Sequence, residues 1–240
     1  MGISPPARTR QNESHAPMTA TMTLPRRHFL FGGASLAALA LSGCATTGNT
    51  RQIAEGPATV PQQYLDMYAA RPEERFPIPA ADISKLDPKY WRQEVADPTG
   101  EQPGTVVVDT GNRFLYLVSE NGRAMRYGVG IGRDGFAWSG RAKIQYKREW
   151  PTWTPPSEMI ERQPELEPYR RGMEPSLMNP LGARALYLFQ NGADTLYRLH
   201  GNGDVLSIGR AVSSGCVRLL QQDIIDLYNR VPAGSPVLVV

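Results

Sequence analysis

The residue types that could carry chemistry meet in one glycine-rich stretch, Tyr197 to Leu219, which contains His200 and Cys216. The sequence has two further histidines and one further cysteine, and all three fall within the first 44 residues. A thiol is a nucleophile only as its thiolate, and a nearby imidazole is the usual means of generating that thiolate near neutral pH. The pair therefore indicates thiol catalysis, although it does not indicate a substrate.

The neighbours of this pair bear on its role, because a lone cysteine is more often a small buried apolar residue than a nucleophile. Cys216 follows Ser213-Ser214-Gly215, in which the glycine permits a sharp turn and a close approach of the backbone. His200 is followed by Gly201-Asn202-Gly203, which places no bulk beside the imidazole. Two strand ends on either side of a turn near Gly209 could bring the ring and the thiol together.

Short β-type segments separated by turn signals predict a mainly β fold, a sandwich or barrel. The expected strands are residues 105–109, 114–118, 126–131, 142–147, 186–189, 196–199 and 237–240. One helix is expected after Cys216, because apolar residues recur at helical spacing from Ile224 to Val231 and Pro232 follows. That helix would put the thiol at or just before its N-terminus, where the helix dipole lowers a thiol pKa and free N–H groups can hold an oxyanion.

A long segment without strand pattern, residues 150–182, contains seven prolines and two tryptophans. A loop of about thirty residues in a compact domain is usually functional or disordered, and Trp150 and Trp153 disfavour disorder. We expect a cover over the active cleft, with a helical turn at 157–160 and Trp153 against the substrate. The alternative is that the aromatic residues merely plug the end of the sandwich.

The motif formed by His200-Gly201, Ser207-Ile208-Gly209 and the run from Ser213 to Arg218 resembles the signature of the YkuD-type L,D-transpeptidases. The arginine two residues after the cysteine is closest to the ErfK-like branch. The resemblance covers about residues 104–240. Many members have a histidine where this chain has Ser214, which leaves His200 as the candidate base.

The resemblance implies that Cys216 attacks the carbonyl of the L-centre of meso-diaminopimelate in a peptidoglycan stem tetrapeptide, and that D-alanine leaves. His200 would carry the proton from the thiol to the leaving amine, with the Gly201 carbonyl fixing its tautomer. The backbone N–H groups of Ser214, Gly215 and Cys216 would hold the oxyanion. An amine would resolve the acyl-enzyme, whereas water in that role would make the protein a stem-peptide hydrolase. A catalytically silent peptidoglycan-binding lipoprotein is disfavoured by the intact pair.

Arg218 is the natural group for a substrate carboxylate, because a guanidinium fork binds carboxylates bidentately. The alternative is an ion pair with Asp223 or Asp226. Asn202 and Ser213 are weaker candidates for orienting the substrate or the backbone. One histidine and one cysteine cannot supply a metal site, so neither a metal nor another cofactor is expected.

The first 43 residues have the layout of an export signal. Arg26 and Arg27 precede an apolar run from Phe29 to Leu41, which is too short to cross a bilayer because about 20 residues are needed. The pattern resembles a twin-arginine signal, and Leu41 to Cys44 resembles a lipobox in which Cys44 would be lipidated. A plain signal peptide with an incidental cysteine, or a buried helix, is the alternative. We expect a periplasmic, lipid-anchored protein, and Ala45 after the cysteine favours the outer membrane.

The remaining chain is expected to divide into residues 44–103, a tether that becomes a domain-packing segment after about Pro61, and the catalytic domain, residues 104–240. The net charge of +3 comes from the first 43 residues, which contain four arginines and one acidic residue. The rest is electrically balanced and gives no reason to expect a nucleic-acid partner. The expected partners are peptidoglycan stem peptides and, as one candidate amine acceptor, an outer-membrane protein, with membrane contact through the lipid anchor only.

Overall fold

The computed structural model of the chain describes residues 59–133 and 138–240. These residues belong to one unit of the chain, Glu55–Val240. The predicted export signal, the lipidation at Cys44 and most of the predicted tether lie outside the described residues.

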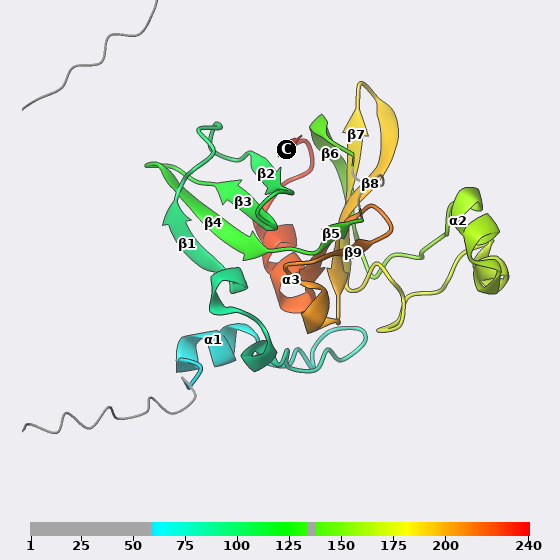
Figure 1. The fold of residues 1–240 in the computed structure, drawn as a ribbon, viewed down its shortest axis with the longest axis horizontal. Coiled ribbons are helices and arrows are strands. Elements are labelled where there is room, and N and C mark those ends of the chain that lie inside the picture. Colours follow the sequence, from blue (N-terminus) through cyan, green and yellow to red (C-terminus); the bar gives the residue numbers. More distant parts are fainter. Residues whose placement is uncertain (1–58, 134–137) are drawn as a thin grey trace, which may run out of the picture. The chain divides into compact units, whose positions relative to one another are not determined.

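A mixed sheet of nine strands forms the framework of this unit (Figure 1), and its strand order is β1-β4-β3-β2-β11-β6-β7-β8-β10. Two neighbouring pairs in it are parallel, β2 with β11 and β8 with β10. A second, two-stranded sheet pairs β5 with β9. The strands are β1 (Gln93–Ala96), β2 (Val106–Asp109), β3 (Phe114–Val118), β4 (Arg123–Gly128), β5 (Ile131–Gly132), β6 (Gly140–Glu149), β7 (Arg184–Gln190), β8 (Ala193–Asn202), β9 (Ala211–Ser213), β10 (Val217–Leu220) and β11 (Pro236–Val239).

Helices are few in the described residues. The α-helices are α1 (Gln62–Met67), α2 (Ser157–Arg162) and α3 (Gln221–Arg230), and the 3-10 helices are η1 (Ile83–Lys85), η2 (Pro88–Tyr90), η3 (Pro164–Tyr169) and η4 (Val205–Ser207). Helix α3 buries Ile224 and Leu227 in the core that β2, β3, β6, β7 and β8 also line. Among the described helices, none combines the length and the apolarity needed to cross a bilayer.

The predicted mainly β fold and the predicted helix before Pro232 are confirmed. Each predicted strand matches an observed one, except that the run 126–131 is divided between β4 and β5. Strands β1, β9 and β10 were not predicted. Strand β1 is a four-residue edge strand with alternating half-buried and exposed residues, and β9 and β10 lie in the serine- and glycine-rich stretch, whose composition hides the β pattern.

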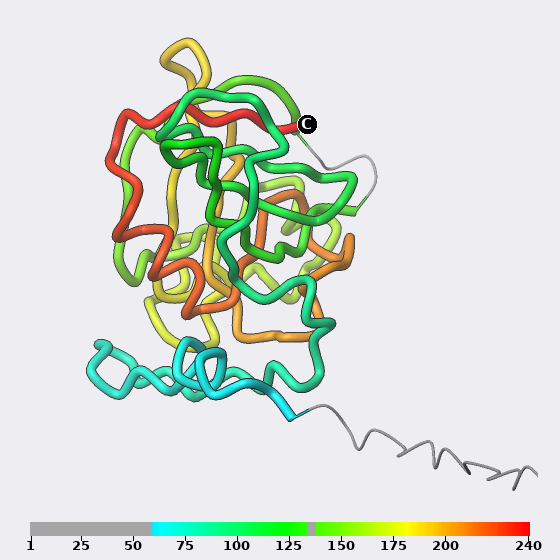
Figure 2. The backbone as a smooth tube through the Cα atoms, turned by 90° about the vertical axis from the view of Figure 1, so that its left-hand side faces the viewer, coloured from blue at the N-terminus to red at the C-terminus, as the bar shows by residue number. Residues whose placement is uncertain are grey.

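Residues 59–92 pack against the catalytic stretch (Figure 2, cyan). A cluster of buried residues joins the two: Tyr68, Ile83, Leu86, Trp91, Ile208 and Leu220. The side-chain amide of Gln222, in the first turn of α3, donates to the carbonyls of Tyr68, Ala69 and Pro79 at 3.4, 3.2 and 3.0 Å. The segment is thus held both by apolar burial and by the beginning of α3.

A buried polar network completes this attachment. The Tyr68 hydroxyl donates to Asp223 Oδ2 at 3.1 Å and accepts from the Arg92 backbone N–H at 2.7 Å. The Arg92 guanidinium lies 3.0 Å from Asp226 Oδ1 and 3.7 Å from Asp223 Oδ1. Burial raises the pKa of Asp223 to about 7, with Arg92 opposing the shift. The Tyr68 hydroxyl therefore satisfies two buried groups that would otherwise lose a partner.

We predict that Tyr68→Phe lowers the free energy of unfolding by about 1–3 kcal/mol, because it leaves a buried carboxylate oxygen and a buried N–H group without this hydroxyl. Urea unfolding at neutral pH measures the change. Tyr64→Phe is the matched control, since Tyr64 belongs to the same cluster but is only partly buried. Equal stability of the Tyr68→Phe variant and the wild-type protein would show that the network does not hold the segment.

Candidate active site

Strands β8 and β10 bring the predicted catalytic residues together. They pair in parallel, with Arg218 opposite His200 and Val217 opposite Leu199. Cys216 directly precedes β10, so its Cα lies about 8 Å from that of His200 by ordinary strand geometry. Both side chains line one cavity of about 350 Å³. The structure therefore places the ring and the thiol on the same cavity, from two adjacent strands, as the prediction requires.

The prediction that Cys216 lies at a helix N-terminus is wrong. Strand β10 separates the thiol from α3, which begins at Gln221. The cause is the apolar sequence of β10, since Val217, Leu219 and Leu220 are all buried. The thiol therefore does not receive the dipole of α3.

The environment of the Cys216 thiol favours its neutral form. Its Sγ donates to the Leu196 carbonyl at 3.7 Å. Burial raises the pKa of Cys216, opposed by the Arg198 backbone N–H and by the charges of Arg198 and Arg218. Cys216 is thus a half-buried thiol that would need a base to become a thiolate.

The His200 imidazole is 5% exposed, and its Nδ1 lies 2.9 Å from the Gly201 carbonyl oxygen, the predicted orienting group. Burial lowers the pKa of His200 to about 4, and the carbonyls of Gly201 and Pro180 oppose this shift. The ring is therefore neutral near pH 7. If Nδ1 carries the proton that is donated to Gly201, Nε2 has a free lone pair and can act as the base.

Gly201, in β8, packs tightly against the first turn of α3. A Cβ at this position would clash with Gln221 Oε1 and lie 3.0 Å from Ile224 Cγ2. Gln221 Oε1 also accepts from the Ala183 backbone N–H at 2.9 Å. The first turn of α3 therefore supports the orientation of His200, although it does not contact the thiol.

The loop before the nucleophile is held by Ser213, which is buried. Its hydroxyl donates to the Cys216 carbonyl at 2.6 Å and accepts from the Gly215 N–H at 3.2 Å. Ser213 and Ser214 both line the cavity, but Ser213 is already occupied in orienting the backbone. The Gly215 N–H is likewise occupied, so the structure does not leave it as an oxyanion donor, contrary to the prediction.

Arg218 lies half-buried in the same cavity as Cys216 and His200. Its Nε atom is buried and has no hydrogen-bond partner in the described part of the chain. The alternative of an ion pair with Asp223 or Asp226 is wrong, because Arg92 lies against both carboxylates and Arg230 also binds Asp226. Arg218 is thus placed as the prediction of a substrate-binding residue requires.

Asn202 is not brought to the thiol. Its side-chain oxygen accepts from the Asp204 backbone N–H at 2.6 Å, and it lines a different cavity of about 370 Å³ together with Pro79 and Gln222. Its assignment to substrate binding is therefore not supported by its position.

The insertion, residues 150–182, covers the thiol from two sides. Trp153, Met159 and Leu181 line the cavity that holds His200 and also a second cavity of about 410 Å³, and Cys216 lines both. Trp150 instead is buried against Phe76 and Ala183. Trp153 therefore matches the expectation of a cover over the active cleft. Trp150 matches the alternative, an aromatic residue that plugs the end of the sandwich.

Further residues line the cavities at the thiol: Arg133 the first, and Trp138, Tyr187, Tyr197 and Arg198 the second. Tyr197 and Arg198 lie on β8, inside the glycine-rich stretch that contains His200. Arg133, Trp138 and Tyr187 come from other parts of the chain, and no motif marks them. In the described ranges 59–133 and 138–240, no group of three or more potential metal ligands is present.

Comparison with known protein families decides the assignment. The YkuD family, described as the L,D-transpeptidase catalytic domain, matches residues 103–239. The chain belongs to this family. The predicted resemblance is confirmed. The N-terminal segment that packs on the site, residues 59–92, lies outside the matched range.

Curated YkuD relatives include members of the predicted ErfK-like branch. The probable L,D-transpeptidase ErfK/SrfK of Escherichia coli K12 is 27% identical over 95% of this chain and 70% of its own length. A putative L,D-transpeptidase of Fuscovulum blasticum is 33% identical over 66% of this chain and 79% of its own. The probable L,D-transpeptidase YbiS of E. coli K12 is 32% identical, and the match spans 60% of this chain and 47% of YbiS.

Solved structures give weaker likenesses. One from Brucella melitensis, described as a probable carnitine operon oxidoreductase, is 45% identical with a TM-score of 0.46 over 66% of this chain and 99% of that one. The L,D-transpeptidase of Mycobacterium smegmatis is 19% identical with a TM-score of 0.41 over 57% of this chain and 58% of that one. The family assignment therefore depends on the sequence comparisons.

We predict that Cys216 is alkylated slowly at neutral pH and that the rate keeps rising above pH 9, because burial raises its pKa. The rate with iodoacetamide is measured in a Cys44→Ser background, in which Cys216 is the one thiol of the chain. NMR of the His200 ring should show a neutral imidazole from pH 5 to 8, above its pKa of about 4. A reactivity plateau below pH 7 would instead reveal a preformed thiolate–imidazolium pair.

Proposed function

We propose that this chain is a peptidoglycan L,D-transpeptidase in which Cys216 is the nucleophile and His200 the general base. The observation that carries the proposal is the parallel pairing of β8 with β10, which puts an oriented neutral imidazole and a thiol on one cavity. The donor would be a stem tetrapeptide, and the scissile amide would join the L-centre of meso-diaminopimelate to D-alanine.

The acylation step follows from the protonation states. His200 Nε2 takes the thiol proton as Sγ bonds to the amide carbon, and the carbonyl oxygen becomes an oxyanion. The backbone N–H groups of Ser214 and Cys216 are the candidate donors for that oxyanion, since Gly215 is engaged with Ser213. The carbon–nitrogen bond then breaks, and the imidazolium returns its proton to the leaving D-alanine amine. A thioester remains on Cys216.

An amine then resolves the thioester, and in this second step Cys216 is the leaving group. An acceptor amine attacks the thioester carbon, His200 takes a proton from that amine, and the thiolate leaves. Trp153, Met159 and Leu181 line both cavities at Cys216, from which an acceptor would reach the thioester. The family match at residues 103–239 supports transfer to an amine as the reaction. Hydrolysis of stem peptides and a silent scaffold are the competing functions, and the assay below distinguishes them.

We predict that Cys216→Ala abolishes D-alanine release and that His200→Ala slows it on the order of 10²–10⁴-fold, the usual contribution of a general base. Products from purified tetrapeptides with and without a D-amino acid acceptor are measured by mass spectrometry. Unfolding midpoints of both variants serve as the control for intact folding.

The products separate the three functions. Cross-linked or exchanged products indicate transfer, and shortened stems alone indicate hydrolysis. No turnover, together with no covalent carbapenem adduct on wild-type Cys216, would indicate a silent scaffold.

We also propose that the chain is exported through its twin-arginine-like signal and anchored in the periplasm by a lipid on Cys44. Support comes from the order of Arg26-Arg27, the apolar run and the lipobox-like Leu41 to Cys44. A lipid anchor followed by the predicted tether would give the catalytic domain reach to the wall. An amine of an outer-membrane protein is then one candidate acceptor.

We predict that Cys44→Ser abolishes incorporation of a palmitate analogue and moves the protein from the membrane to the soluble periplasmic fraction. Replacing Arg26 and Arg27 by lysine should block export while leaving the folded domain intact in the cytoplasm. Labelling of the Cys44→Ser variant equal to that of the wild type would exclude this residue as the lipidation site.

A further inference from the structure

Two guanidinium groups, those of Arg133 and Arg218, line the Cys216 cavity. Burial lowers the pKa of Arg218, the charges of Asp204 and Cys216 oppose this shift, and the charge of Arg133 adds to it, so the two guanidinium groups interact electrostatically. Among the described residues, neither arginine forms an ion pair, whereas Arg92, Arg184, Arg198 and Arg230 each do.

This arrangement is unfavourable for the protein alone. The Arg218 Nε is buried without a hydrogen-bond partner among the described residues, and the positive charge of Arg133 acts on the same guanidinium group. An anionic ligand that entered the cavity would remove both penalties. The cavity also contains the nucleophile and the base, so such a ligand would be part of the substrate.

Arg133 is fixed to the loop that carries the nucleophile. Its backbone N–H donates to the Ser213 carbonyl at 3.0 Å. Just before it, a Cβ on Gly132 would lie 2.8 Å from the Gly215 Cα, so the two backbones pack directly on each other. The guanidinium of Arg133 therefore starts from a backbone position that is set relative to Cys216.

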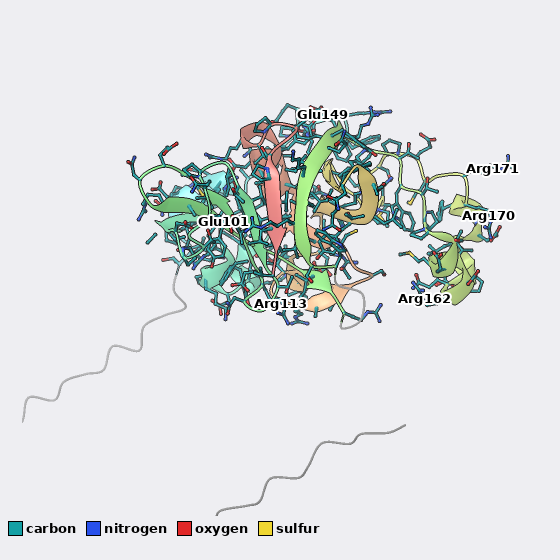
Figure 3. The ribbon with its side chains drawn as sticks, turned by 90° about the horizontal axis from the view of Figure 1, so that it is seen from above. Glu101, Arg113, Glu149, Arg162, Arg170 and Arg171 are labelled. Atoms are coloured by element: carbon teal, nitrogen blue, oxygen red, sulfur yellow. The ribbon has the colours of Figure 1, made fainter. Side chains whose placement is uncertain are left out.

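Arg162 is not part of this pair. It lines an adjoining cavity of about 220 Å³ with Arg133 and Ser214, but it belongs to α2, on the insertion (Figure 3). Arg162 also takes part in other interactions. Arg133 and Arg218 are thus the cations that remain for a ligand in the Cys216 cavity.

We propose that Arg133 and Arg218 bind two different carboxylates of the acyl donor, so that the enzyme selects stem peptides whose diamino acid keeps a free carboxylate. The inference rests on the proposed function. The carboxylates of a stem tetrapeptide include one on the leaving D-alanine and one on the D-centre of meso-diaminopimelate. Each would take one guanidinium fork.

The register assigns the two carboxylates. Arg218 lies directly opposite His200 on the paired strand, and His200 protonates the leaving nitrogen. The carboxylate of D-alanine is separated from that nitrogen by one carbon, so we assign its binding to Arg218. Arg133, which is exposed at the edge of the cavity, binds the carboxylate at the far end of the diaminopimelate side chain. After D-alanine leaves, Arg133 still holds the acyl group in place.

The experiment compares three donors: the free tetrapeptide, its D-centre carboxamide and its C-terminal D-alaninamide. With wild-type enzyme, each amide should lower kcat/KM on the order of 10- to 100-fold, the effect of losing one charged hydrogen-bond pair. In Arg133→Gln the D-centre carboxamide should have the same kcat/KM as the free tetrapeptide, whereas the D-alaninamide should still have a lower kcat/KM. In Arg218→Gln the D-alaninamide should match the free tetrapeptide, and the D-centre carboxamide should have the lower kcat/KM. Arg133→Lys should restore part of the discrimination.

The matched control is Arg123→Gln, since Arg123 pairs with exposed Glu94 at the far edge of the sheet and should leave all three values unchanged. Binding of the three donors to a Cys216→Ala chain gives a second readout that needs no turnover. Equal turnover of the three donors by the wild-type enzyme would overturn this inference alone, as would an equal loss for all donors in Arg133→Gln. Release of D-alanine from none of them would overturn the proposed function and this inference together.

Discussion

The parallel pairing of β8 with β10 is the constraint on which the site depends. Parallel neighbours cannot be joined by a tight hairpin, so the chain between them must leave the sheet and return. Residues 203–216 make this crossover, with η4 and β9 on the way. Strand β9 pairs with β5, and the Gly130 N–H donates to the Arg218 carbonyl at 2.9 Å. The nucleophile loop is thereby held from both sides before any substrate arrives.

The crossover is in turn held by residues outside the family match. Ile208 and Leu220 are buried under Tyr68 and Trp91 of the N-terminal segment. The same segment reaches the insertion, because Glu74 accepts from Trp150 Nε1 at 2.9 Å and pairs with Arg184 at 2.7 Å. One segment thus supports both the loop that bears the thiol and the start of the insertion, where Trp150 is buried. The packing segment is therefore part of the architecture of the site.

The sequence allowed the central pair, the strands and α3 to be predicted because their signals are local. Between β3 and β4, for example, Asn-Gly at positions 121 and 122 is a local hairpin signal, and both residues have the positive φ that this turn type requires, 60° and 65°. The start of α3 was misplaced because β10 is short and apolar and can be read as a first helical turn. Arg133 could not be found, since nothing within its own segment shows that β5 packs on the nucleophile loop. Such long-range contacts depend on the register between strands.

The electrostatics of the site set the order of its proton transfers. The positive charges of Arg198 and Arg218 are the groups that partly offset the burial of Cys216. A bound carboxylate would neutralise Arg218 and so raise the thiol pKa further. The buried imidazole resists protonation for the same reason of desolvation. In the proposed mechanism a separated thiolate–imidazolium pair is therefore least stable when substrate is bound, so we expect proton transfer to accompany the formation of the carbon–sulfur bond. The negative charge would then pass to the oxyanion, for which the backbone N–H groups of Ser214 and Cys216 are the candidate donors.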